Sequence, residues 1–379
     1  MADKKEKNII NDYEQYLRQG EPSKREKALT WATAIGLQQV DGLQTSEYLH
    51  SVARRNIEDE ISSGEAQQLI ASYYEQKSAR HEPEDSETEE ADRVTANINH
   101  ILSTSTLDFT THGFKMLHRQ IFKGVFKHAG EFRHYDITKR EWVLRGASVL
   151  YLGNADLQRA LDYDLEQERQ FSYTSLTPDD IVAHITRFVA GLWQIHPFGE
   201  GNTRTTAVFA IQYLRSLGFD VNNLLFAQHS WYFRNALVRA NYKSTQVDYE
   251  PIFLERFFRN LLLGEKWELR NRYMLINSDN DQPTKHRPST DQVPTKLEDI
   301  SVSPSVKALV KAIGTQKLKI SEMMATVGLK HRPTFRVNYL DPAIEAGLVR
   351  MLYPNTPRHP RQRYLLTPKG IIYLNKNKD

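Results

Sequence analysis

The stretch that most restricts how this chain can fold is a glycine-containing loop between two apolar helical patterns, at residues 194–209. Apolar side chains recur at helical spacing before the loop and again after it. Pro197 ends the first pattern, and Gly199 and Gly201 allow backbone angles with positive φ that other residues disfavour. The sequence therefore predicts a helix, a tight loop and a second helix that begins near Asn202.

The side chains in and just after this loop suit a phosphate-transfer site. A helix N-terminus offers unpaired N–H groups and the positive end of the helix dipole, which together favour a bound phosphate. His196 is a candidate general base, Glu200 a candidate Mg²⁺ ligand, and Arg204, one helical turn further on, a candidate phosphate contact. The local pattern predicts a transferase acting on a phosphate-bearing substrate.

The loop resembles the signature of the Fic family, His-x-Phe-x-Asp/Glu-Gly-Asn-Gly-Arg-x-x-Arg. The matching residues are His196, Phe198, Glu200, Gly201, Asn202 and Arg204. Two positions differ, since Thr203 stands where the second loop glycine is usual and Ala207 stands where the second arginine is usual. The resemblance extends over residues 91–263.

This resemblance implies a protein adenylyltransferase, which transfers the AMP of ATP to a Ser, Thr or Tyr hydroxyl of a target protein, with self-modification expected. It implies that His196 deprotonates the hydroxyl, that Glu200 holds Mg²⁺ against the phosphates, and that Arg204 offsets charge on the leaving group. The expected partners are ATP and a target protein. The nucleotide-binding residues that it implies are Gly199, Gly201, Asn202, Thr203, Arg204, Asn235 and Tyr242.

Ala207 leaves other interpretations open. A transferase of the same fold could use another nucleotide or phosphate donor. Alternatively, the chain could be a DNA-binding regulator whose Fic domain senses nucleotide, or a regulatory protein with a dead site. The intact His196 argues against the last two, because binding alone does not require a general base.

Residues 1–80 are expected to form a helical regulatory module, in which Gly42 ends one helix and Ser46 caps the next. The segment that ends in Asp41-Gly42 resembles the inhibitory motif Ser/Thr-x-x-x-Glu-Gly/Asn of the antitoxin modules that restrain Fic enzymes. In that family the inhibitory Glu pairs with the second signature arginine, which here is Ala207. We therefore expect Asp41 to lack that partner, and the module to act mainly by packing.

Residues 81–92 hold seven acids and are expected to form a solvated linker before a catalytic domain at 93–276. Within that domain, residues 137–144 are β-prone with turn-like flanks. They resemble the Fic flap, a small hairpin that lays a target segment beside the catalytic His by strand addition. Lys139 and Trp142 are the candidate target contacts.

A second linker is expected over 277–299, and residues 300–379 predict helices followed by two strands joined by a basic loop. This order resembles a winged helix-turn-helix domain. Residues 301–379 hold 14 Lys and Arg against 4 Asp and Glu, which favours contact with acidic DNA or protein. The candidate DNA contacts are Lys330, His331, Arg332, Arg336, Arg358, Arg361 and Arg363.

The amino-acid composition restricts the class of protein and the cellular compartment that we expect. The chain has 379 residues, 40% hydrophobic and 26% charged, which is typical of a globular protein of two or three domains. It has no cysteine, which excludes disulfides, thiol catalysis and cysteine zinc sites. With no apolar run of about 18 residues and no signal peptide, we expect a cytoplasmic protein without a membrane partner. The expected fold class is mainly α: a Fic-type helical core with a small β-hairpin flap, plus a C-terminal winged helix-turn-helix domain.

Overall fold

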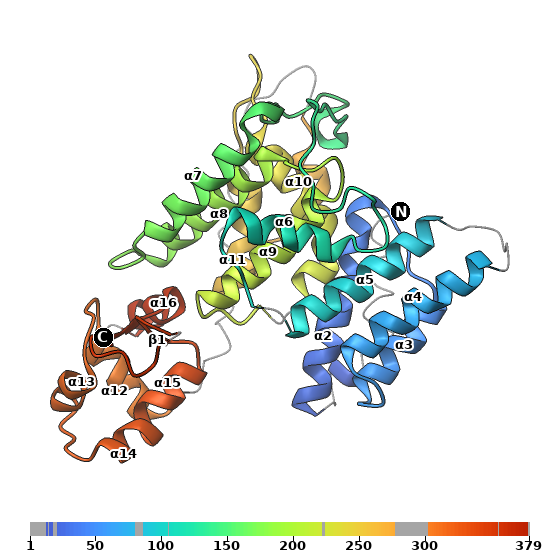
Figure 1. The fold of residues 1–379 in the computed structure, drawn as a ribbon. Coiled ribbons are helices and arrows are strands. Elements are labelled where there is room, and N and C mark those ends of the chain that lie inside the picture. The colour runs from blue at the N-terminus through green and yellow to red at the C-terminus, as the bar shows by residue number, and fades with distance from the viewer. Residues whose placement is uncertain are drawn as a thin grey trace.

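The computed structural model is mainly helical, as predicted, and its elements form three groups that follow one another along the chain (Figure 1). It describes residues 13, 15–17, 21–79, 86–104, 106–221, 224–276, 302–354 and 356–377. The linker predicted over 277–299 lies outside these residues. Over the described residues, no helix combines the length and the apolar character needed to cross a membrane.

The N-terminal group packs its helices around a core that Ala227, from later in the chain, also joins. Its elements are α2 (Pro22–Gly36), the 3₁₀ turn η1 (Leu37–Asp41), α3 (Glu47–Ile57), α4 (Ser63–Ala79) and α5 (Ser86–Thr104). The predicted helix start at Ser46 is confirmed, because its Oγ accepts a hydrogen bond from the Leu49 N–H at 3.1 Å. In the core, the fully buried Trp31 donates its indole N–H to Asn56 Oδ1 at 2.9 Å.

The acidic segment expected over 81–92 as a solvated linker is, from Ser86 onward, the start of α5. Glu87 lies in the first turn, where the positive end of the helix dipole favours a carboxylate. Asp92 is fully buried and accepts hydrogen bonds from the Ser46 N–H at 2.9 Å and the Tyr74 hydroxyl at 2.8 Å. The linker prediction was wrong here because an acidic run suits a helix N-terminus as well as a solvated linker.

The middle group is organised around α8 and α9. Its elements are α6 (Thr111–Ile121), η2 (Trp142–Leu144), η3 (Asn154–Asp156), α7 (Leu157–Gln170), α8 (Pro178–Ile195), α9 (Asn202–Ser216), α10 (Leu225–Asn241), α11 (Ile252–Leu263) and η4 (Asn271–Met274). A capping box starts α8, because Thr177 Oγ1 accepts from the Asp180 N–H at 3.1 Å and Asp180 Oδ2 accepts from the Thr177 N–H at 3.2 Å. The predicted order of helix, loop and helix around Pro197 is confirmed.

The segment predicted to be a β-hairpin turns back on itself as a loop and not as two strands. The Glu141 N–H donates to Ala147 O at 3.0 Å, but Trp142–Leu144 form the 3₁₀ turn between them. Val143 and Leu144 are both buried, although neighbouring residues of a strand point to opposite faces. Burying both side chains in the core therefore favours the turn over a strand.

The elements of the C-terminal group follow the predicted order of helices and then two strands, except for a last helix that was not predicted. They are α12 (Pro304–Ile313), α13 (Ile320–Thr326), α14 (Arg332–Phe335), the π-helical η5 (Arg336–Leu340), α15 (Asp341–Glu345), β1 (Val349–Met351), β2 (Tyr364–Leu366) and α16 (Pro368–Lys376). The strands pair antiparallel, with Val349 opposite Leu366. We call the connection between them, residues 352–363, the wing. The η5 turn is π-helical because the Asp341 N–H donates to Arg336 O, five residues earlier.

The C-terminal group packs on the middle group just beyond the end of α9. The Asn375 side chain donates to Leu176 O at 3.2 Å. The backbones of Gly218 and Gly347 meet so closely that a Cβ on Gly218 would lie 2.2 Å from Gly347 O. Only glycine permits this approach, which ties the C-terminal group to the helix that begins at the predicted site.

Candidate functional site

His196 ends α8 in a left-handed backbone conformation, with φ 50° and ψ 57°. Such a conformation persists in a residue other than glycine only where the surroundings hold it. Arg133 provides that hold, since its Nε donates to His196 O at 2.8 Å and its backbone N–H donates to Pro197 O at 2.9 Å. Arg133 therefore sets the direction in which the His196 ring leaves the helix.

The hydrogen bonds of the His196 ring define its protonation. Nδ1 lies 3.1 Å from Trp193 O, and because a carbonyl can only accept, Nδ1 carries the proton. Nε2 is buried and has no hydrogen-bond partner among the described residues. Burial lowers the pKa of His196 well below its usual value, and the positive charge of Lys139 lowers it further. Nε2 is therefore unprotonated at neutral pH, as a general base requires.

The loop between α8 and α9 is held by its own side chains. Gly201 has φ 72°, and a Cβ there would lie 2.2 Å from a carbon of the Phe122 ring. Asn202 Oδ1 accepts from the Phe198 N–H at 3.0 Å, and Asn202 Nδ2 donates to Phe198 O at 2.7 Å. Thr203 Oγ1 accepts from the Trp193 indole N–H at 2.9 Å. These side chains shape the loop, and their contacts with nucleotide stay predictions, as does that of Gly199.

Glu200 is exposed on this loop, and His118 supports its backbone. His118 Nδ1 accepts from the Gly130 N–H at 2.8 Å, so the ring proton is on Nε2, which donates to Glu200 O at 3.1 Å. Burial lowers the pKa of His118 to about 4. The Glu200 carboxylate has no ion pair among the described residues, which also contain no group of three or more His, Asp or Glu side chains able to hold a metal.

Arg204 is 2% exposed, its guanidinium lies 4.8 Å from the centre of the Phe122 ring, and its polar partners come from before the middle group. Its Nε lies 2.9 Å from Asp41 Oδ2, its Nη2 donates to Glu90 Oε1 at 2.7 Å, and its Nη1 donates to Gln38 Oε1 at 3.1 Å. The expectation that Asp41 lacks a cationic partner was therefore wrong. Arg204 and Ala207 are three residues apart and share a face of α9, so Arg204 can reach the carboxylate that Ala207 cannot bind.

The space beside His196 is nearly closed. A cavity of about 20 Å³ remains there, lined by Asp41, Lys139, Glu141, Trp193, His196, Gly201, Asn202, Thr203 and Arg234. A cavity of this size holds about one water molecule. This volume is too small for a nucleoside triphosphate.

The looped segment contributes a buried ion pair to this site. The Glu141 carboxylate lies 2.7 Å from Arg234 Nη1 and accepts a hydrogen bond from the Tyr151 hydroxyl at 3.2 Å. Lys139 lines the cavity, and burial lowers its pKa. Trp142 does not line the cavity, and it is 48% exposed. The loop therefore covers the base with Lys139 and Glu141 and presents Trp142 outward.

The predicted residues of α10 do not line this cavity. Asn235 is fully buried and donates to Asn271 Oδ1 at 2.9 Å, and Tyr242 follows the end of the helix. Their contacts with nucleotide stay predictions, while Arg234 is the residue of α10 that faces the site. Sequence reasoning missed Gln38, Glu90, His118, Arg133, Glu141 and Arg234, because no local spacing relates them to His196 or Arg204.

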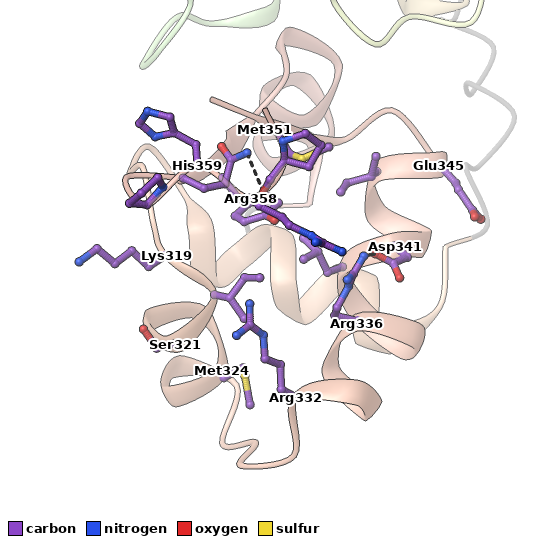
Figure 2. Close-up of a pocket in the computed structure, with 17 residues that line it drawn as sticks. Lys319, Ser321, Met324, Arg332, Arg336, Asp341, Glu345, Met351, Arg358 and His359 are labelled. Carbon is purple, nitrogen blue, oxygen red and sulfur yellow. Dashed lines mark hydrogen bonds and ion pairs between the residues drawn. The ribbon is translucent and has the colours of Figure 1, made fainter. Parts of the chain in front are cut away.

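The basic residues of the C-terminal group separate into two sets. Arg332, Arg336 and Arg358 line a groove of about 810 Å³ between the third helical segment (α14, η5 and α15) and the wing (Figure 2). Arg363 instead donates to Lys317 O at 2.9 Å and lies 3.7 Å from Glu322. The exposed side chains of Lys330, His331 and Arg361 do not line the groove. Contact of all these residues with DNA stays a prediction.

Two family models match the chain. The Fic/DOC family model matches residues 108–214, which contain His196, Glu200 and Arg204. This chain is a Fic domain protein. The model of the Filamentation induced by cAMP protein Fic-like C-terminal domain matches residues 304–367, which lie within the C-terminal group.

Comparison with individual proteins gives two distant relatives of this Fic domain protein. A protein adenylyltransferase of Bartonella henselae is 24% identical over 181 residues, 45% of this chain and 32% of that protein. The chain thus spans about a third of that relative's length. A crystal structure of a Fic family protein from Desulfovibrio desulfuricans G20 aligns with 97% of this chain and 94% of its own, at 20% identity and a TM-score of 0.37. That TM-score is too low for the overlap to carry an argument about fold or activity.

Proposed function

We propose that this Fic domain protein transfers AMP from ATP to a hydroxyl group of a target protein. The observation that carries the proposal is the unprotonated Nε2 of His196, which has no partner within the part of the chain that the structure describes, on a loop that also presents the Glu200 carboxylate and leads into α9. A site that only bound nucleotide would need no buried free base. The name of the Bartonella henselae relative, a protein adenylyltransferase, supports the same assignment.

In the proposed reaction, His196 Nε2 takes the proton of a Ser, Thr or Tyr hydroxyl. The hydroxyl oxygen then attacks the α-phosphorus of ATP, and the bond from that phosphorus to the oxygen bridging to the β-phosphate breaks. Pyrophosphate leaves, AMP remains on the protein as a phosphodiester, and the proton passes from His196 to solvent. The N–H groups at the start of α9 and the Arg204 guanidinium, once released from Asp41, would stabilise the phosphate charge.

Glu200 fits the expected Mg²⁺ ligand in its chemistry. It is an exposed carboxylate on the catalytic loop without an ion pair among the described residues, and Mg²⁺ usually takes one or two carboxylates together with phosphate oxygens and water. Mg²⁺ bound there would neutralise charge on the phosphates. Glu200→Ala should therefore remove the Mg²⁺ dependence of ATP binding, measured by calorimetry with and without the metal.

We infer that the closed arrangement is a restrained form of the enzyme, with Asp41 and the adjacent Gly42 as the regulatory residues. Asp41 shares the Arg204 guanidinium with Glu90 and Gln38 and competes for it with a phosphate, and the cavity beside His196, about 20 Å³, is too small for a nucleotide. The N-terminal group would then inhibit by charge pairing as well as by packing.

The test is transfer of radiolabel to proteins of a cell lysate and to the enzyme itself. Wild type, Asp41→Asn and His196→Ala would each be incubated with Mg²⁺ and ATP labelled at either the α- or the γ-phosphate. We expect label from the α position only, strongest with Asp41→Asn, and a loss of about 10² to 10⁴ in rate with His196→Ala. Because His196 contacts the hydroxyl and not the phosphates, ATP binding by His196→Ala should stay within a few-fold of wild type.

Two results would contradict the proposal. Label transferred from the γ position would show a phosphotransferase, and α-label retained in His196→Ala would remove His196 as the base. Parallel reactions with α-labelled GTP, CTP and UTP test the donor, which Ala207 leaves open.

A further inference from the structure

The groove between the third helical segment and the wing has a positively charged rim. Figure 2 shows the side chains of Arg332, Arg336 and Arg358 pointing into the space between the helix and the wing. Arg336 lies 3.4 Å from Asp341, whereas Arg332 and Arg358 have no ion pair among the described residues. Two guanidiniums that face one space without an ion pair among the described residues favour a bound anion, most of all a carboxylate or phosphate that they can bind with two hydrogen bonds each.

The floor of the same groove is apolar. It is made by Met324 of α13, Leu340 and Ile344 of the third helical segment, and Met351 of β1. Two of the chain's six methionines lie here. Methionine side chains are flexible and polarisable, and they adapt to the shape of a bound apolar group. The groove therefore offers both a binding site for an anion and an apolar surface for an uncharged side chain.

The charge along the groove argues against the phosphate backbone of a duplex. Asp341 and Glu345 line one end, and Figure 2 shows them on the side away from Lys319. A DNA strand carries a negative charge at every nucleotide, so it would meet these carboxylates unfavourably, whereas a peptide can carry a carboxylate at the arginines and an uncharged side chain at the acidic end. DNA also takes a protruding helix into its major groove, about 12 Å wide, whereas here the arginines face a hollow walled by the wing.

We propose that this groove binds a short acidic peptide segment of a protein partner, with an apolar side chain on the methionine floor and a carboxylate between Arg332 and Arg358. The volume of about 810 Å³ lies within the range of about 300–1,000 Å³ usual for ligand sites. Recognition of an acidic motif by an arginine cluster, anchored by one buried apolar side chain, is an established mode of peptide binding. This inference does not depend on the transferase reaction.

The test selects ligands without assuming a partner. A phage library of random dodecapeptides would be panned on the full-length protein, and the most enriched peptide would be synthesised with a fluorescent label. Anisotropy titrations would then use wild type, Arg358→Glu, Arg332→Glu and Met351→Ala. The matched control is Arg361→Glu, which makes the same charge change on the same wing at a residue outside the groove.

We expect enriched peptides to carry Asp or Glu beside Leu, Ile, Met or Phe. Arg358→Glu and Arg332→Glu should each weaken binding by about tenfold or more, and Met351→Ala by several-fold, as for anchor contacts. Arg361→Glu should change affinity by less than about threefold, because an exposed charge contributes little. Unchanged thermal unfolding of each variant would show that the domain stays folded.

Four outcomes would overturn the proposal. They are panning that yields no enriched peptide, enriched peptides without acids, an equal loss of affinity with Arg361→Glu, and a short duplex DNA that binds wild type and displaces the peptide. The last outcome would identify the groove as a nucleic-acid face.

Discussion

His196 and His118 are both buried, and their hydrogen bonds with the backbone give the two Nε2 atoms opposite roles. In His196 the proton on Nδ1 faces Trp193 O, which leaves Nε2 as a free base. In His118 the Gly130 N–H occupies Nδ1, so Nε2 carries the proton and donates to Glu200 O. One histidine is thereby suited to take a proton, and the other to hold the loop that carries Glu200.

The protonation of His118 should make the fold sensitive to acid. Burial lowers its pKa from 6.5 to about 4, so between these pH values the unfolded chain binds a proton at this residue that the folded chain does not. The contribution of neutral His118 to the free energy of unfolding is fully present above pH 6.5. It is lost as the pH falls towards 4, at up to about 1.4 kcal/mol per pH unit. Urea denaturation at pH 7.0 and 5.5 would measure this loss. The first pH lies above the range from 6.5 to about 4, and the second lies nearly halfway into it.

His118→Gln is the comparison for that measurement. Glutamine has no group that titrates in this range, so its free energy of unfolding should fall less between the two pH values, even if it starts lower. Equal losses in the two proteins would show that His118 is not held neutral in the folded state.

The conformation of the loop between α8 and α9 depends on Gly201 and Asn202. Gly201 has φ 72° and lies against the Phe122 ring, while Asn202 closes the loop on Phe198. Gly201 is thus required both for the backbone turn and for the close packing against Phe122 at the end of α6. Its replacement tests both requirements together.

Gly201→Ala should destabilise the Fic domain by about 3 kcal/mol. Left-handed backbone in a residue with a Cβ costs about 1–2 kcal/mol, and forcing a methyl group into a packed ring adds about 1–3 kcal/mol. Gly42→Ala is the matched control, because Gly42 has φ 75° but a Cβ there would meet no other atom within 4 Å. It should cost only the backbone part, about 1–2 kcal/mol. Denaturant unfolding that gave equal losses would contradict the contact with Phe122.

Across the whole molecule, the N-terminal group contacts α9 through two arginines, Arg204 and Arg215, and the Arg215 Nη1 donates to Leu102 O of α5 at 2.8 Å. Arg204 of α9 is held by Asp41 and Gln38 of η1 and by Glu90 of α5. The same helix is tied at its other end to the C-terminal group through Gly218. The restraint that we propose would therefore depend on the assembled chain and not on the Fic domain alone.

Removing the charge of Asp41 should activate the enzyme. Asp41→Asn loses the ion pair to Arg204, and we expect initial rates of α-label transfer to rise about tenfold or more, equivalent to about 1.4 kcal/mol of barrier. Glu58→Gln is the control, since it removes an exposed ion pair with Lys24 in the same group. A change of less than about twofold in Asp41→Asn, or an equal rise in Glu58→Gln, would mean that the N-terminal group acts by packing alone.

Features that depend on neighbours in the chain could be predicted from the amino-acid sequence. The α8 and α9 helices, the loop at Pro197, the cap at Ser46 and the mainly helical class all rest on short-range signals, namely apolar period, capping residues and glycine. The residues of the Fic signature are likewise contiguous, and the match to the Fic/DOC family confirms the resemblance. Local physics acts the same way in any fold, so these features need no knowledge of the rest of the molecule.

The partners of the charged side chains were decided only by the tertiary structure. Asp41 was expected to be unpaired, but it forms an ion pair with Arg204. The acidic run was expected to be a linker, but its Glu90 also pairs with Arg204 and its Asp92 is buried. The sequence predicted strands over residues 137–144. In the structure Val143 and Leu144 are both buried, and the segment forms a loop over His196. A buried charge must find a counter-charge wherever the packed elements bring one, so its partner follows from the whole fold and not from its neighbours in the chain.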